Sequence, residues 1–237
     1  MNSTPINRKV PIDLEAEEFK QIGYNLVDKI SELIFNIRDL PVTPAEEEHT
    51  VKAHLKADKS LPEEGSDPGK LINETANLLV EHSLYNGHPR FWGYITSSPA
   101  PLGILGDFLA SAINSNVGAW ALSPMASEIE AQTIRWISSL IRYPAGGGLI
   151  VSGGNVANYI GFIAAIRSKA GLDIREKGIA RNNEHLRIYC SQETHTWIQK
   201  AADLFGLGTE SIRWINSDKN QKMEISGLKN AIDEDIR

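Results

Sequence analysis

The chain has 237 residues, of which 41% are hydrophobic and 23% are charged, and its formal net charge is −6. This balance is typical of a globular protein and excludes a wholly disordered one. The mixture of charges without a basic block argues against a nucleic-acid partner. The apolar runs are too short to span a membrane, and Met1 to Lys9 lack the apolar core of a secretory signal. The only cysteine, Cys190, excludes an internal disulfide and is consistent with a cytoplasmic location.

Helical periodicity dominates the part of the chain before Gly146. Asp13 can cap a first helix, whose apolar residues recur at helical spacing as far as Ile37, before Pro41 and Pro44 end it. Ser123-Pro124 marks the start of a later helix, with serine as the cap and proline in the first turn. Between them we expect an acidic segment at 45–68 that is mostly irregular or forms short helices, a helix at 71–79, an aromatic loop at 87–101 and a helix at 102–113.

Strands and helices alternate after Gly146. We expect strands at 149–151, 186–190 and 211–215, helices at 155–170 and 194–206, and a final helix capped by Ser226. Such alternation indicates a largely parallel sheet that is covered by helices. Three strands are few for a sheet of this kind, and the last residues fall inside or at the edge of a helix. We therefore expect residue 237 to be a cut in a longer chain.

Two strand–helix junctions could carry chemistry. The turn Ser152-Gly153-Gly154 leads from a strand into a helix, where unpaired N–H groups and the helix dipole favour a phosphate. It lacks the signatures of a nucleotide P-loop or a dinucleotide fold, and a turn serving only geometry is the alternative. His195 lies near the next junction, where an imidazole could stack on a flat ring or exchange a proton. The alternative is a helix-start histidine satisfied by a nearby carbonyl.

Other chemistry-bearing residues form weaker patterns. A buried cysteine at the end of a strand is usually inert, so Cys190 near His195 does not indicate a thiol nucleophile. Aromatic side chains in the loops could wall an apolar substrate pocket, although core or interface packing is the commoner role; they are Phe91, Trp92, Tyr94 and Trp120. Four scattered histidines do not form a metal-ligand spacing, so we expect no metal; they are His49, His54, His82 and His88.

Four segments in order resemble the pyridoxal-5′-phosphate (PLP) decarboxylases of aromatic amino acids, histidine and glutamate. They read HPRFWGYI, SPMASEIE, SGGNVANYIGFIAAIRSKAG and THTWIQKAADLFGLG. The resemblance runs from the first helix to the end of the chain. It implies an α/β, type I PLP-dependent transferase-like fold that is incomplete, with N-terminal helices followed by the first strands and helices of the large, mostly parallel-sheet domain. Residues 1–95 would be a helical segment that packs in a dimer, and residues 96–237 the first part of the PLP-binding domain.

The resemblance also implies roles for individual residues. Gly154 and Asn155 would hold the cofactor phosphate, although the family often has serine at the position of Asn155. His195 would stack on the cofactor ring and act as the catalytic histidine, and Tyr94 and Ser97 would lie on the substrate side. Three positions depart from the bulkier residues of aromatic-amino-acid decarboxylases and leave the substrate side chain open; they are Ile95, Thr96 and Gly118.

The function that the resemblance implies is decarboxylation of an amino acid by a cytoplasmic homodimer. PLP forms an imine with the substrate amine, and its ring accepts the electrons left by carbon dioxide. The family's imine-forming lysine and ring-nitrogen aspartate follow the matched segments, and no lysine present, Lys200 included, lies in that lysine motif. We therefore expect this chain alone to be inactive. The alternatives are another carbon–carbon lyase, an aldehyde-forming enzyme of the same fold, or a catalytically silent partner protein.

Overall fold

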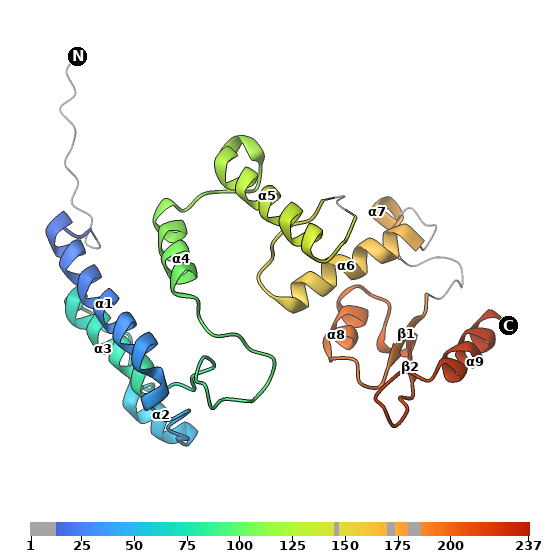
Figure 1. The fold of residues 1–237 in the computed structure, drawn as a ribbon, viewed down its shortest axis with the longest axis horizontal. Coiled ribbons are helices and arrows are strands. Elements are labelled where there is room, and N and C mark those ends of the chain that lie inside the picture. Colours follow the sequence, from blue (N-terminus) through green and yellow to red (C-terminus); the bar gives the residue numbers. More distant parts are fainter. Residues whose placement is uncertain (1–12, 145–146, 170–173, 180–185) are drawn as a thin grey trace, which may run out of the picture. The chain divides into compact units, whose positions relative to one another are not determined.

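The computed structural model describes residues 13–144, 147–169, 174–179 and 186–237. It separates into two compact units, one ending at Asn114 and the other beginning at Ser115, and each is described here by itself (Figure 1). Met1 to Lys9 and the expected helix end at residue 170 lie outside the described residues. The division by role at 95/96 stays a prediction.

The first unit is helical. Its elements are α1 (Ala16–Asn36), the short 3-10 helix η1 (Ile37–Asp39), α2 (Glu48–Leu55), α3 (Pro68–Glu81) and α4 (Pro101–Ile113). Helices α1 and α3 lie side by side (Figure 1), and Lys29 Nζ of α1 donates a 2.6 Å hydrogen bond to Asn77 Oδ1 of α3. No helix in the described ranges is long and apolar enough to cross a membrane.

Local sequence explains where these helices begin. Asp67 caps α3 because its carboxylate accepts a 2.7 Å hydrogen bond from the Lys70 amide, and Pro68 occupies the first turn. The prediction that Asp13 caps the first helix is wrong, because the chain is still extended at Glu15 and α1 begins after that residue. Segment 45–68 is mostly irregular, as expected, and contains one short helix, α2.

The expectation that the histidines are scattered is wrong for two of them. His54, in the last turn of α2, and His82, which follows α3, stack with their ring centroids 4.0 Å apart. Both contact the carboxylate of Glu46. Linear spacing does not reveal this group, because the loops between α1 and α4 bring the three residues together.

The second unit combines helices with a small sheet. Its elements are η2 (Trp120–Leu122), α5 (Pro124–Leu140), α6 (Gly154–Lys169), α7 (Ile174–Lys177), β1 (Ile188–Ser191), α8 (Trp197–Leu204), η3 (Thr209–Ser211), β2 (Ile212–Ile215) and α9 (Ile225–Ile236). Strands β1 and β2 are parallel, with Ile188 opposite Ile212 and Ser191 opposite Ile215. A short helix lies between them in sequence, as a parallel pair requires.

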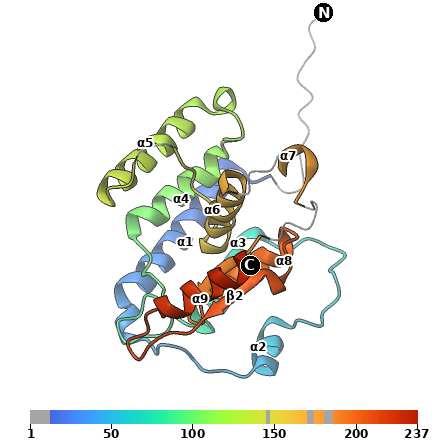
Figure 2. The ribbon, with the colours of Figure 1, turned by 90° about the vertical axis from the view of Figure 1, so that its right-hand side faces the viewer.

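Helices α8 and α9 cover opposite faces of this strand pair (Figures 1 and 2). Successive side chains of a strand point to opposite faces. On one face, Cys190 and Ile212 form a buried cluster with Ile198 and Ala202 of α8. Alternation of this kind explains how two short strands acquire helices on both sides.

The other face is held by a charged cluster around Asp235 of α9. Its carboxylate accepts hydrogen bonds from Arg213 Nη2 at 2.6 Å, from Tyr189 Oη at 2.9 Å and from Arg187 Nε at 3.1 Å. The bonds from Arg213, with smaller contributions from Tyr189 and Arg187, lower the pKa of the Asp235 carboxyl to about 2. The cluster therefore fixes α9 to the sheet while the carboxylate is ionised.

Two expectations for this unit are wrong. Residues 149–151 are not a strand, because the Ile150 amide donates its 2.8 Å hydrogen bond to the Glu130 carboxylate of α5 and not to a neighbouring strand. Ser226 does not cap the final helix, because α9 begins one residue earlier, after Glu224. The expected strand at 211–215 is confirmed as β2, and the expected left-handed stop is confirmed at Gly206, with φ 72°.

Candidate functional site

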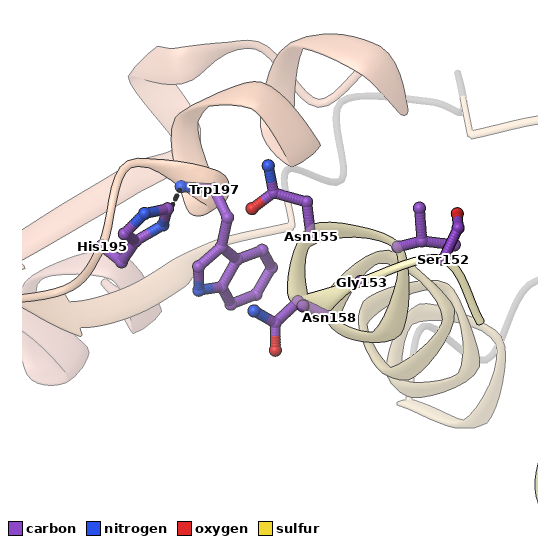
Figure 3. Close-up of a pocket in the computed structure, with 8 residues that line it drawn as sticks. Ser152, Gly153, Asn155, Asn158, His195 and Trp197 are labelled. Atoms are coloured by element: carbon purple, nitrogen blue, oxygen red, sulfur yellow. Dashed lines mark hydrogen bonds between the residues drawn. The ribbon is translucent and has the colours of Figure 1, made fainter. Parts of the chain in front are cut away.

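A pocket of about 570 Å³ lies between the first turn of α6 and the loop that joins β1 to α8. Eight residues line it: Ser152, Gly153, Gly154, Asn155, Val156, Asn158, His195 and Trp197. Figure 3 shows the indole of Trp197 between His195 and the side chains of Asn155 and Asn158. The pocket lies within the second unit, and its volume is in the range that small-molecule sites occupy.

Backbone amides at the start of α6 form one wall of the pocket. Gly153 has φ 131°, a conformation that glycine adopts readily and other residues do not. Its carbonyl accepts the first helical hydrogen bond, from the Ala157 amide at 3.1 Å. The amides of Gly154, Asn155 and Val156 come before that bond and have no acceptor within the helix. Space within 4 Å of Gly153 and Gly154 is open on the side where a Cβ would stand. An anion can therefore approach these amides.

His195 forms the opposite wall, and its ring has a defined hydrogen-bonding state. The Trp197 amide donates a 3.2 Å hydrogen bond to His195 Nδ1, so the proton of the neutral ring lies on Nε2 (Figure 3). The imidazole is exposed, and its Nε2–H can donate to a ligand. The alternative from sequence is a ring that is satisfied by a nearby carbonyl. The bond from the Trp197 amide is different, because the ring accepts it.

The loop that carries His195 is tied to the ends of both strands. The Gln192 amide donates a 3.0 Å hydrogen bond to the Ile215 carbonyl of β2, and Gln192 Nε2 donates to Asn216 Oδ1 at 2.7 Å. The Thr194 amide donates to the Ser191 carbonyl at 3.0 Å. His195 therefore follows the carboxyl end of a parallel strand, which is where open α/β sheets bind ligands.

Aromatic packing fixes α6 against α8 and thereby sets the distance across the pocket. Phe162 of α6 meets the edge of Trp197 with ring centroids 6.0 Å apart and stacks on Phe205 at 5.9 Å. Tyr159 meets Phe205 edge-on, also at 5.9 Å. Such pairs add stability beyond the area they bury. The glycine turn and the histidine loop are consequently held by one aromatic cluster.

The pocket contains three of the five residues that sequence analysis proposed for the site. Gly154, Asn155 and His195 line it together. Tyr94 and Ser97 belong to the first unit, where Tyr94 is 90% exposed with φ 59° and Ser97 lines a separate hollow beside Leu84 and Tyr85. Their proposed role on the substrate side stays a prediction.

Sequence analysis missed three lining residues: Val156, Asn158 and Trp197. Asn158 lies three residues after Asn155, a spacing that places both on one helix face and that could have indicated it. No spacing signal indicates Trp197, whose position depends on the contact with Phe162. Burial raises the pKa of the Cys190 thiol, which argues further against a nucleophilic role.

These features define an α/β protein with an open helix start and an exposed histidine beside it. Residues 50–237 match the family described as the pyridoxal-dependent decarboxylase conserved domain. Because this match covers most of the sequence, the chain belongs to that family.

Known proteins agree with this assignment. The chain is 31% identical over 225 residues to an aromatic-L-amino-acid decarboxylase of Bacillus atrophaeus, covering 94% of this chain and 45% of the relative. It is 28% identical over 230 residues to a phenylacetaldehyde synthase of Petunia hybrida, covering 94% of this chain and 44% of the relative. The crystal structure of Oryza sativa TDC with PLP and tryptamine superposes with a TM-score of 0.80 at 23% identity, covering 97% of this chain and 48% of that one. The expected fold, a partial PLP-dependent decarboxylase fold, is confirmed, and the chain spans about half the length of these relatives.

Proposed function

We propose that this chain supplies the cofactor-holding part of a PLP-dependent carboxy-lyase that decarboxylates an amino acid. The observation that carries the proposal is the pocket that the first turn of α6 and His195 line together, with the Trp197 indole between them (Figure 3). Family membership and the similarity to decarboxylases support the same assignment.

The residues of the pocket fit PLP in charge and in shape. Three amides and the positive end of the α6 dipole suit a phosphate, and the open space over Gly153 and Gly154 admits it to the backbone. The His195 imidazole offers a flat surface for the pyridine ring. When bound, PLP supplies a ring that accepts the electrons of the substrate bond that breaks.

Residues of this chain would bind the phosphate, orient the ring and donate a hydrogen bond to a ligand. The amides of Gly154, Asn155 and Val156 would hold the phosphate, and Asn155 could add its side-chain amide. His195 would stack on the ring, while its Nε2–H holds a proton that it can share with a ligand oxygen. The Trp197 amide fixes that tautomer through the 3.2 Å bond to Nδ1. General acid–base help of this kind typically contributes about 10² to 10⁴ in rate.

The binding part of the proposal is tested by comparing PLP with pyridoxal, which lacks the phosphate. We expect the chain to bind PLP saturably and pyridoxal at least about tenfold more weakly, equivalent to about 1.4 kcal/mol. Trp197 lies in the pocket, so its fluorescence should be quenched, and a Trp197→Phe variant identifies its contribution. Equal affinity for the two ligands would refute phosphate binding by α6.

The catalytic part needs a second test. After PLP binding and borohydride reduction, mass spectrometry should find no stoichiometric label on one lysine, and the chain alone should release no carbon dioxide from amino acids. One fully labelled lysine together with turnover would contradict this expectation. The decarboxylase proposal itself is tested in a longer protein that contains this chain together with an imine-forming lysine. Release of carbon dioxide from aromatic L-amino acids by that protein would support the proposal. A protein that binds PLP but never turns over is the outcome expected of a silent partner protein.

An aldehyde-forming enzyme is the second candidate, and the similarity to the Petunia hybrida phenylacetaldehyde synthase favours it. Both candidates need the phosphate turn and the stacked histidine. Product analysis separates them, because a decarboxylase yields an amine whereas an aldehyde synthase yields an aldehyde.

We also propose that the complete protein is a cytoplasmic homodimer in amino-acid metabolism. Supporting the dimer, large apolar side chains on α1 and α3 are more than half exposed within the first unit; they include Phe19, Leu71 and Leu79. Exposed apolar faces of this kind often mark subunit contacts. Sedimentation of the chain should show that it associates with itself. A compact, stable monomer would contradict the dimer proposal.

A further inference from the structure

Glu46, His54 and His82 form a compact group in the first unit. Glu46 Oε1 lies 3.1 Å from His54 Nε2, and Glu46 Oε2 lies 2.7 Å from His82 Nδ1. One ligand atom from each residue falls within 4.8 Å of the other two. The side chains of Glu46 and His82 are mostly buried, and that of His54 is 41% exposed. Three donor atoms therefore converge at a site that solvent can still reach.

The backbone holds two of these residues in place. The Tyr85 amide donates a 3.0 Å hydrogen bond to the Val42 carbonyl, which ties the segment after His82 to the segment before Glu46. Buried His88 ties the same segments again, because its Nε2–H donates to the Leu40 carbonyl at 3.0 Å while its Nδ1 accepts from the Arg90 amide. Glu46 and His82 are thus fixed relative to each other before any ligand binds.

Separations within the group suit coordination. Ligand atoms at about 2.0–2.2 Å from a tetrahedral zinc ion stand roughly 3.3–3.6 Å apart. The nitrogen–oxygen separations of 3.1 and 2.7 Å end on different oxygens of Glu46 and need to open by less than about 1 Å, and one ligand atom from each residue already lies within 4.8 Å of the other two. The rings stack at 4.0 Å and 23°, so their in-plane lone pairs run nearly parallel, and one ring has to turn for both nitrogens to reach a single ion. The His54 side chain is 41% exposed and can make this turn.

The charges suit a cation as well. Glu46 places its carboxylate against one ring nitrogen of each histidine. Glu81 Oε2 lies 3.9 Å from His82 Nε2, the nitrogen that faces away from Glu46. A metal-binding imidazole usually donates its second N–H to a carboxylate, a backbone carbonyl or water, and Glu81 is near enough to accept that bond after a small side-chain movement. Two imidazoles and one carboxylate are ligands that Zn²⁺ and its neighbours favour.

We propose that Glu46, His54 and His82 bind one divalent late first-row transition-metal ion, represented by Zn²⁺, and leave a fourth position for water. The bound ion would join α2 to the end of α3. It uses no residue of the pocket in the second unit, so this site is independent of the proposed PLP function.

Zinc titration of the whole chain, in competition with a chromophoric chelator, tests the site. We expect one equivalent of Zn²⁺ to bind, and Co²⁺ to give the visible absorption of a four-coordinate ion. Losing a partner of a metal ligand costs about 10- to 100-fold in affinity, so losing a ligand should cost at least about 100-fold. Glu46→Gln, His54→Ala and His82→Ala should each show that loss.

His49→Ala is the matched control, since His49 lies on the same helix as His54, its Nε2 lies 3.4 Å from Thr50 Oγ1, and among the described residues it belongs to no metal-ligand group. Its affinity should stay within about threefold of the unmodified chain. His54→Ala is the decisive variant, because its exposed side chain can be removed with little effect on folding, which a melting curve in chelator verifies. Unchanged Zn²⁺ affinity in His54→Ala, or an equal loss in His49→Ala, would overturn the proposal and leave a hydrogen-bonded group only.

Discussion

Replacing Gly154 by aspartate and by asparagine separates charge from size at the proposed phosphate site. Gly154 begins α6, and nothing lies within 4 Å of an added Cβ, so both side chains fit the folded chain. The phosphate of PLP carries nearly two negative charges. A single negative charge about 6 Å from such a dianion costs roughly 1.4 kcal/mol even at the dielectric constant of water. We expect Gly154→Asp to bind PLP at least about tenfold more weakly than Gly154→Asn.

Stability should move in the other direction. An acidic residue in the first turn interacts favourably with the helix dipole by about 0.3–1 kcal/mol, so Gly154→Asp should melt no lower than Gly154→Asn. Absorbance titrations with PLP and thermal melts measure the two effects on the same samples. The difference in affinity should shrink in high salt, because salt screens exposed charges. Equal PLP affinity of the two variants at low salt would refute phosphate binding at this turn.

Three further predictions concern single residues. Gly153→Ala places a Cβ at φ 131° and should lower the free energy of unfolding by about 1–3 kcal/mol, which chemical denaturation measures; an unchanged midpoint would contradict the strain. His195→Ala should weaken PLP binding and, because the Trp197 amide loses its acceptor, lower the free energy of unfolding by about 0.5–2 kcal/mol. His195→Phe loses the same bond but should recover most of the PLP affinity if stacking is what matters; normal affinity in both variants would instead indicate a structural histidine. The pKa of Asp235 is lowered to about 2, so its contribution to stability is complete above its unfolded pKa of about 3.9 and is lost as the pH falls from there towards 2. Asp235→Asn should make the urea midpoint less dependent on pH between pH 4 and pH 2. An equally steep fall of the midpoint in the variant would assign the acid transition to other groups.

Elements that local signals specify were predictable from sequence. Helix α4 begins at Pro101 and α5 at Pro124, each with proline in the first turn, close to the starts expected from the apolar periodicity. Gly206 ends the α8 region in a left-handed conformation, as expected for a glycine after the last helical turn. Proline and glycine affect the backbone within a few residues of their own position. Their effects therefore do not depend on contacts with distant residues.

Features that depend on distant partners were not predictable. Residues 149–151 have the apolar character of a strand, but a strand requires a neighbour, and Glu130 binds the Ile150 amide instead. The contact between His54 and His82 depends on the loops that tie Tyr85 to Val42. In the pocket, Gly154 and His195 were foreseeable from strand–helix junctions, whereas Trp197 owes its place to Phe162. Tertiary contacts decide each of these cases.

Thiol labelling of the single cysteine can report local opening of the second unit. Cys190 is 8% exposed within the cluster under α8, and burial raises the pKa of its thiol. An alkylating reagent can reach this sulfur only when α8 separates from the sheet, so the labelling rate follows the opening equilibrium of that region. Because α8 also carries the pocket wall, a ligand that binds between α6 and α8 should slow the labelling in proportion to its occupancy. Thiol chemistry could therefore measure ligand binding in this chain without any catalytic activity.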